Sequence, residues 1–298
     1  MTGGGQLETV AIGLTGGSIR ASTPYLFVSL GECVIEKSDR INLGQEGILV
    51  LGAMVGYAGS YATGDPWLGV LAAGCAGSAL GALHAIACSL PRVNDIAIGI
   101  AVLLFGVGIA FLLGKPFIQP AAPMLPGLEL GWWSQNEAIR AALRVNALFF
   151  VGLALSVFLR WGFGRSRWGL IVRTVGDCED AARALGFSIL GARFFATVAG
   201  AFLSLYYPGS WTESLSSGQG LMAVALVIFA RWDPLRCLWA LLLFGAAGAL
   251  GPALQSAGVD QVYYLVGAAP YALTLAILIA SSSRERRALG ALRELRAV

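Results

Sequence analysis

Histidine is nearly absent from this sequence of 298 residues, which has a single residue of this type, His84, inside an apolar run. A catalytic triad or metal cluster that depends on histidine therefore cannot be assembled within the chain. The five cysteines do not occur at metal-ligand spacings, so we expect five thiols and no metal site. Gly114 and Lys115 resemble a phosphate-binding loop only faintly, because Ile109 and Pro116 replace two of its required residues. These absences predict a protein that is not an enzyme and that binds no cofactor itself.

Charged residues are also scarce, at 12% of the chain, whereas 57% of the residues are hydrophobic and the mean hydropathy is +0.73. This balance is typical of an integral membrane protein that contacts membrane lipid. The net charge of +3 does not call for a nucleic-acid partner. The N-terminus lacks a basic leader followed by a cleavable apolar core, so we expect no signal peptide.

Apolar runs close to the roughly 20 residues that cross a bilayer predict an all-α polytopic membrane protein with about nine transmembrane helices. The predicted spans cover about residues 18–37, 43–62, 66–90, 95–114, 141–160, 189–207, 217–231, 235–254 and 262–281. If the N-terminus lies outside and the C-terminus in the cytoplasm, 16 of the 20 basic residues fall inside, as the positive-inside tendency requires. We therefore expect one transmembrane domain over residues 1–298.

The longest predicted outside loop, from Lys115 to about Arg140, is rich in proline and contains Trp132 and Trp133. Tryptophan is typical of membrane interfaces, so these two residues are expected to act as interfacial anchors. A connector is the favoured interpretation of this loop, and a docking surface for an external partner is the alternative.

The longest polar run, residues 161–193, interrupts the apolar chain and carries five arginines, which predicts a cytoplasmic loop. Asp177, with Asp180 three residues later, is typical of a helix start, and Gly186 is typical of a helix end. The helix between them has about eight residues and a length of roughly 12 Å. We expect this loop to receive a mechanical push.

Two regions of the chain resemble each other. The runs GQEGILVLGAM (44–54) and DPWLGVLAAGCAGSALGAL (65–83) are similar to GQGLMAVALVI (218–228) and DPLRCLWALLLFGAAGALGPAL (233–254). Because five predicted helices separate the two starts, the copies cross the membrane in opposite directions. The sequence predicts inverted repeats, spans 1–4 and spans 6–9, joined by span 5. Chance similarity of two glycine-rich apolar runs is the alternative.

The second copy of the repeat starts with too few apolar residues for a full crossing. Only ten consecutive apolar residues, Leu221 to Ala230, precede Arg231. They form about 15 Å of helix, which is half of a ~30 Å hydrocarbon core. The start of each copy should therefore lie within the membrane, as a broken helix that faces the protein interior or a wet cavity. The candidate substrate-pathway residues are Asn42, Gln45, Glu46, Asn94, Gly218, Gln219 and Gly220. For Asn42, a role as the N-cap of the span at 43–62 is as strong an interpretation as contact with the substrate. For Asn94, the alternative is that it lies at the start of the span at 95–114.

Five further motifs are present: STPYLFVSLGECVIEKSDRINLGQEG (22–47), VNDIAIGIA (93–101), RTVGDCEDAARALG (173–186), YYPGSWTE (206–213) and ALVIFARWDPL (225–235). They support a resemblance over roughly residues 20–280. Together they resemble the shorter permease subunit of bacterial simple-sugar and nucleoside ABC importers, in the branched-chain amino acid/ribose-type permease superfamily. The resemblance implies a cytoplasmic coupling loop at 161–193, with a coupling helix that seats in a partner ATPase. The implied coupling residues are Asp177, Glu179, Asp180, Ala181, Ala182, Arg183, Ala184, Leu185 and Gly186.

The resemblance also implies a set of partners in the bacterial cytoplasmic (inner) membrane. These are a second, longer permease subunit, an ABC ATPase with two fused nucleotide-binding domains, and an extracytoplasmic substrate-binding protein. ATP and magnesium would be bound by the ATPase and not by this chain. The expected cargo is a nucleoside or a related small polar ligand such as a purine base or simple sugar. An ion-coupled secondary transporter with inverted repeats is the main alternative, and a passive structural subunit is a weaker one.

Overall fold

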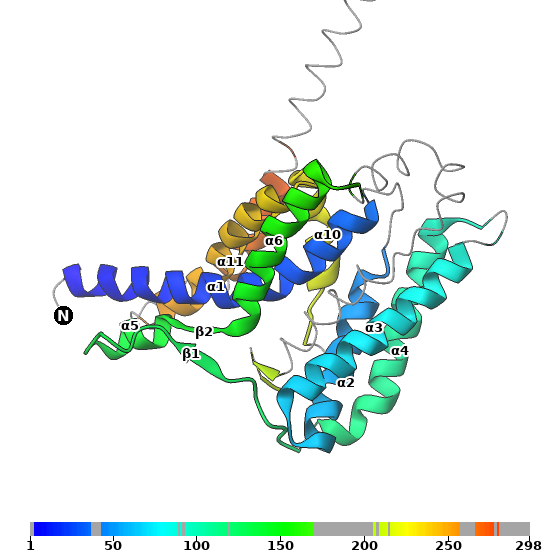
Figure 1. The fold of residues 1–298 in the computed structure, drawn as a ribbon. Helices are drawn as coiled ribbons and strands as arrows, with labels where there is room; N and C mark the ends of the chain where they lie inside the picture. Colours follow the sequence, from blue (N-terminus) through cyan, green and yellow to red (C-terminus); the bar gives the residue numbers. More distant parts are fainter. Residues whose placement is uncertain are drawn as a thin grey trace, which may run out of the picture.

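The computed structural model describes residues 3–36, 43–88, 90, 93–118, 120–167, 169, 205–206, 209–213, 215–256, 266–276 and 279. The described part of the chain is mainly helical (Figure 1). Its elements are α1 (Gly3–Glu36), α2 (Gln45–Thr63), α3 (Pro66–Cys88), α4 (Asp95–Gly114), η1 (Lys115–Phe117), β1 (Gly127–Glu129), α5 (Glu137–Ala142), β2 (Arg144–Asn146), α6 (Ala147–Arg165), α10 (Gln219–Phe229) and α11 (Pro234–Ser256).

Four of the described helical segments are long and apolar enough to cross a membrane. They are Pro66–Cys88, Ile96–Phe117, Ala147–Arg165 and Pro234–Gln255, and Gln219–Phe229 is a shorter apolar helix. Large apolar side chains such as Leu104 and Leu112 of α4 are exposed on the outside of the bundle. In a bilayer such side chains contact lipid, so the helices fit the predicted multi-pass membrane protein.

Helix α1 is longer than the span predicted at 18–37. It has 34 residues, about 51 Å at 1.5 Å per residue, and starts at Gly3. The end of the added segment contacts α5, since a Cβ atom on Gly16 would lie 2.6 Å from the Ala142 Cα atom. One turn further on, the Arg20 guanidinium donates a hydrogen bond to the Ala141 carbonyl. Periodicity in a bilayer-length window could not find this extension, because contacts with distant residues support it.

Helix α1 packs along α11, although the two helices lie at opposite ends of the sequence (Figure 1). A Cβ atom added to Gly17 would lie 2.6 Å from the Cβ atom of Ala249, so the two backbones are in close contact there. Toward the other end of α1, the thiols of Cys33 and Cys237 lie 3.2 Å apart and both are buried. Small residues therefore allow the two helices to stay close over most of their shared length.

Helix α2 lies between α3 and α4 and has glycine at both contacts. A Cβ atom on Gly47 would lie 2.5 Å from the Leu103 carbonyl oxygen of α4, and one on Gly69 of α3 would collide with the Gly56 carbonyl of α2. These glycines let the helix backbones touch directly, so α2, α3 and α4 form one tight group.

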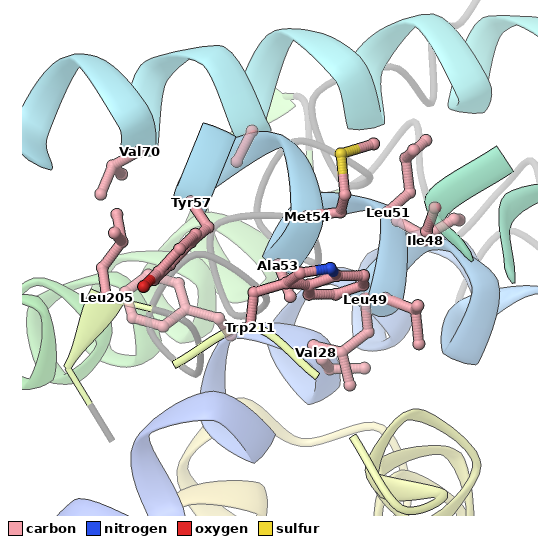
Figure 2. Packing of buried hydrophobic residues seen from close by; sticks show 14 of the residues in the cluster. Val28, Ile48, Leu49, Leu51, Ala53, Met54, Tyr57, Val70, Leu205 and Trp211 are labelled. Carbon is pink, nitrogen blue, oxygen red and sulfur yellow. The ribbon is translucent and has the colours of Figure 1, made fainter. Parts of the chain in front are cut away.

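The buried apolar residues form two clusters that share α1 and α10. The first joins α1 to α2, α3 and α4 and contains Trp211, whose ring lies beside Leu49 and Ala53 in Figure 2. The Trp211 indole N–H donates to the Gly114 carbonyl at 3.0 Å. The second cluster joins α1, α6, α10 and α11 through residues such as Leu226 and Leu241. Helices α1 and α10 therefore lie between the two groups of helices.

Helices α3 and α11 start in the same way, at the prolines of the two Asp-Pro pairs of the predicted repeat. The Asp65 carboxylate accepts a hydrogen bond from the Trp67 backbone N–H at 2.8 Å. The Asp233 carboxylate accepts two, from Leu235 at 3.1 Å and Arg236 at 3.2 Å. Both aspartates satisfy N–H groups that a helix leaves unpaired at its start.

The proline-rich loop after η1 is fixed to the end of α2. Tyr57 Oη donates to the Pro120 carbonyl at 2.9 Å, and Ser60 Oγ donates to the Pro123 carbonyl at 2.7 Å. Strands β1 and β2 then pair antiparallel, with Leu128 opposite Val145. The sequence did not predict this ribbon, because each strand has three residues and depends on its partner.

Candidate functional site

The first turns of α2 and α10 meet, and the contact is between Glu46 and Gly220. A Cβ atom on Gly220 would lie 2.6 Å from the Glu46 Cα atom and 2.7 Å from its backbone nitrogen, so a larger residue does not fit there. Figure 1 shows the two helices extending from this junction toward opposite ends of the molecule. Both helices begin at a glutamine that follows a glycine, Gln45 and Gln219.

The Glu46 carboxylate binds the start of α10. It accepts hydrogen bonds from Ser216 Oγ at 2.5 Å, from the Gly218 N–H at 3.0 Å and from the Gly220 N–H at 2.7 Å. Unpaired N–H groups and the helix dipole make a helix start favourable for an anion. Glu46 is buried, and its charge is therefore compensated by three donors at a position that an external anion would otherwise occupy.

The loop before α10 has an unusual backbone. Ser217 has a φ of 46° and Gly218 a φ of 81°, both in the left-handed region. Glycine adopts this conformation readily and serine rarely does, so Ser217 carries local strain. The conformation directs the Gly218 and Gly220 N–H groups toward the Glu46 carboxylate, which favours keeping the strained turn.

Two glutamine side chains flank the junction and have amide oxygens that can accept further hydrogen bonds. Gln45 donates through Nε2 to the Glu32 carboxylate of α1, and because a carboxylate only accepts, this fixes which end of the amide faces Glu32. The buried Oε1 atoms of Gln45 and Gln219 have no hydrogen-bond partner among the described residues. These two acceptors suit a ligand that offers O–H or N–H donors.

The remaining predicted pathway residues have different positions. Asn94 is the exposed N-cap of α4, where its Oδ1 accepts from Ile96 at 2.9 Å and Ala97 at 3.3 Å. The structure thus supports the structural interpretation of Asn94, and its role in a pathway stays a prediction. Asn42 lies outside the described residues, and the N-cap position of α2 is held by Gly44.

The whole predicted coupling helix, Asp177 to Gly186, and residues 189–204 of the span predicted at 189–207 also lie outside the described residues. Their predicted roles are therefore not tested by the geometry. Sequence reasoning did not single out Ser216 as a hydrogen-bond donor to Glu46. Its signal was limited to its place between the YYPGSWTE motif and the Gly-Gln-Gly start of α10.

Within the described ranges, His, Cys, Asp and Glu do not gather into a group of three or more that could hold a metal ion. The chemistry at the junction is hydrogen bonding by amides, hydroxyls and one compensated carboxylate. Groups of this kind bind or release a polar ligand without a change of covalent bonds.

An apolar helical bundle with buried polar groups at two apposed helix starts defines the class of multi-pass membrane transport proteins. The chain belongs to the family of branched-chain amino acid transport system / permease components, which matches residues 14–282. This confirms the resemblance drawn from the motifs, and it confirms the prediction of a permease subunit rather than an enzyme.

Three relatives are similar over most of their length. The putative glucose ABC transporter permease protein TsgC13 of Haloferax volcanii is 33% identical over 260 residues, covering 83% of this chain and 79% of the relative. The nucleoside ABC transporter permease protein NupC of Lactococcus lactis and the guanosine ABC transporter permease protein NupQ of Bacillus subtilis are each 27% identical, covering 86% of this chain and 88% of the relative. No solved structure matches.

Proposed function

We propose that this chain is the transmembrane permease subunit of an ATP-driven ABC importer that carries a neutral, donor-rich ligand, a nucleoside or a simple sugar. The observation that carries the proposal is the compensated Glu46 carboxylate at the start of α10, beside two amide oxygens. The names of the relatives, which refer to glucose, nucleosides and guanosine, support the same ligand class.

The electrostatics favour a neutral ligand. The helix start that would attract an anion is already occupied by Glu46, so a phosphate or carboxylate on the cargo would meet negative charge without a compensating donor. Ribose hydroxyls, base N–H groups and sugar hydroxyls are uncharged donors that match the Oε1 atoms of Gln45 and Gln219.

The proposed architecture is two inverted repeats, spans 1–4 and 6–9, joined by span 5, which corresponds to α6. Three observations support it: the Gly-Gln starts of α2 and α10, the Asp-Pro starts of α3 and α11, and the contact of α2 and α10 start to start. Two elements related by a twofold axis in the membrane plane meet in this way. The proposed orientation places the N-terminus outside and the C-terminus in the cytoplasm of a bacterial inner membrane.

The proposed complex contains a second, longer permease subunit, an ATPase with two fused nucleotide-binding domains that binds ATP and magnesium, and an external substrate-binding protein. The loop at 161–193 transmits the motion of the ATPase to the permease. Replacing Ala182 with Trp in its EDAARALG run should abolish ligand-stimulated ATP hydrolysis while the complex still assembles, because the bulky ring prevents close seating. Ligand-stimulated hydrolysis at the unaltered rate would refute this role of the helix.

Reconstitution tests the proposed function. The purified complex in proteoliposomes should take up a radiolabelled nucleoside or simple sugar when ATP is supplied to the ATPase side, and not when ATP is replaced by a proton or sodium gradient. Uptake driven by either gradient without ATP would establish the ion-coupled alternative instead. A thermal-shift screen of the cognate binding protein against nucleosides, purine bases and pentoses identifies the ligand to use.

A further inference from the structure

A cavity of about 450 Å³ lies between the end of α6 and the start of α11, away from the junction of α2 and α10. Arg160, Trp161 and Arg165 line it from α6, and Asp233 lines it from the turn before α11. Its volume is within the range of small-molecule sites. Figure 1 shows that α6 ends and α11 begins at the same end of the molecule.

The described lining of the cavity has an excess of positive charge. Asp233, the one acidic residue among the described lining residues, is already engaged, because Oδ2 pairs with the Arg160 guanidinium and Oδ1 accepts the first N–H groups of α11. Arg160 keeps further donors, since its side chain is 52% exposed and a guanidinium has five N–H groups. Arg165 is exposed and does not occur in the ion pairs among the described residues. Two guanidinium groups therefore face one carboxylate that is already paired.

The surface beside the cavity is apolar and aromatic. Trp161 is 53% exposed and Phe158 is 61% exposed, and their ring centroids lie 6.2 Å apart on the outer face of α6. Trp239, on the outer face of α11, is 71% exposed. In a membrane helix, tryptophan and arginine meet at the level where acyl chains give way to lipid headgroups. The cavity therefore lies at headgroup depth and borders on lipid.

We propose that this cavity binds the headgroup phosphate of an anionic phospholipid. Arg165 is the main phosphate ligand, since a guanidinium binds a phosphate through two parallel N–H donors, and Arg160 adds a second contact while Asp233 holds it in place. The glycerol and upper acyl chain lie against Trp161. A lipid bound there connects the last turn of α6 to the start of α11, so it links the connecting span to the second repeat.

Quenching of Trp161 fluorescence tests this proposal. The permease subunits are placed in nanodiscs of phosphatidylcholine with increasing amounts of brominated phosphatidylglycerol or brominated phosphatidylcholine, and the Trp161 signal is the difference between wild type and Trp161→Phe. We expect the anionic lipid to quench Trp161 at about one fifth of the concentration that the neutral lipid needs. The Trp239 signal, obtained in the same way with Trp239→Phe, should respond equally to both lipids, because that residue does not line the cavity.

Two arginine variants show whether the cavity is responsible. Arg165→Gln should remove the preference for the anionic lipid, whereas Arg167→Gln, an exposed arginine two residues away that does not line the cavity, should leave it unchanged. Equal quenching by the two lipids, or equal effects of the two variants, would overturn the proposal. If millimolar inorganic phosphate abolishes the preference of Trp161 quenching for the anionic lipid, the cavity binds a free ion instead of a lipid. If adding the ATPase abolishes that preference, the cavity is a contact site for the ATPase.

Discussion

The starts of α2 and α10 share a Gly-Gln pair but differ at the next residue, which is Glu46 in one and Gly220 in the other, and these two residues touch. Two glutamates at such a contact would repel each other, and two glycines would leave the N–H groups of α10 without an acceptor. The difference shows how two helix starts of similar sequence can form a stable contact: one supplies a charge and the other supplies space and donors.

Removing the charge should have the largest effect on this contact. Glu46→Ala leaves three donors without their acceptor, at about 1 kcal/mol each, so we expect a loss of roughly 3 kcal/mol in stability and more than about a tenfold fall in uptake. Glu46→Gln should lose less, because its amide oxygen still accepts. Thermal unfolding in detergent and ATP-driven uptake measure the two effects. A Glu46→Ala complex with normal stability and uptake would contradict a role for the carboxylate.

Adding a side chain at Gly220, on the α10 side of the contact, should cause the next largest loss of stability. Gly220→Ala places a methyl group 2.6 Å from the Glu46 Cα atom, and we expect a loss of about 1–3 kcal/mol from forced separation of the two helices. Gly108→Ala on α4 is the matched control, because a Cβ there meets nothing within 4 Å and alanine favours the helix. If both variants unfold at the same temperature as the wild type, the helices are not in the close contact described.

Smaller losses of stability are expected at the Asp-Pro starts of α3 and α11, and the difference between the two losses isolates one ion pair. Asp233→Ala removes a helix cap and the ion pair with Arg160, at about 2 kcal/mol together, whereas Asp65→Ala removes a single cap bond at about 1 kcal/mol or less. The asparagine variants keep an acceptor for the cap, so Asp233→Asn should retain part of the stability. Equal unfolding temperatures for the two alanine variants would show that the ion pair contributes nothing.

The smallest effect is expected from joining α1 to α11. Oxidation of the Cys33 and Cys237 thiols by copper phenanthroline should form a disulfide, because the two sulfur atoms lie 3.2 Å apart. If α1 and α11 move together, uptake after cross-linking should stay within about twofold of the reduced complex, and Cys33→Ser provides the control without a cross-link. A large fall in uptake that a reductant restores would mean that the two helices separate during transport.

Composition and apolar length were sufficient to predict a helical membrane protein, and the run of ten apolar residues before Arg231 predicted the short α10 that the structure contains. The short apolar runs at the starts of the two predicted repeat copies indicated Gln45, Glu46 and Gly220 as candidate pathway residues. The hydrogen bonds of Glu46 could not be predicted. Its partner Ser216 lies 170 residues away, and periodicity and motifs in a single sequence do not reveal which distant segments meet. The early start of α1 and the β1–β2 ribbon escaped prediction for the same reason.

The packing of α1 along α11 has a consequence for how the molecule can deform. In the proposed architecture α1 belongs to the first repeat, but its backbone touches that of α11 near Gly17 and its Cys33 thiol lies beside that of Cys237. We therefore expect the units that tilt as rigid bodies to differ from the two halves of the sequence, with α1 moving with α11, and α2 moving with α3 and α4. Glu46 lies at the contact between these two units, and we expect a rotation of one unit against the other to strain its three hydrogen bonds.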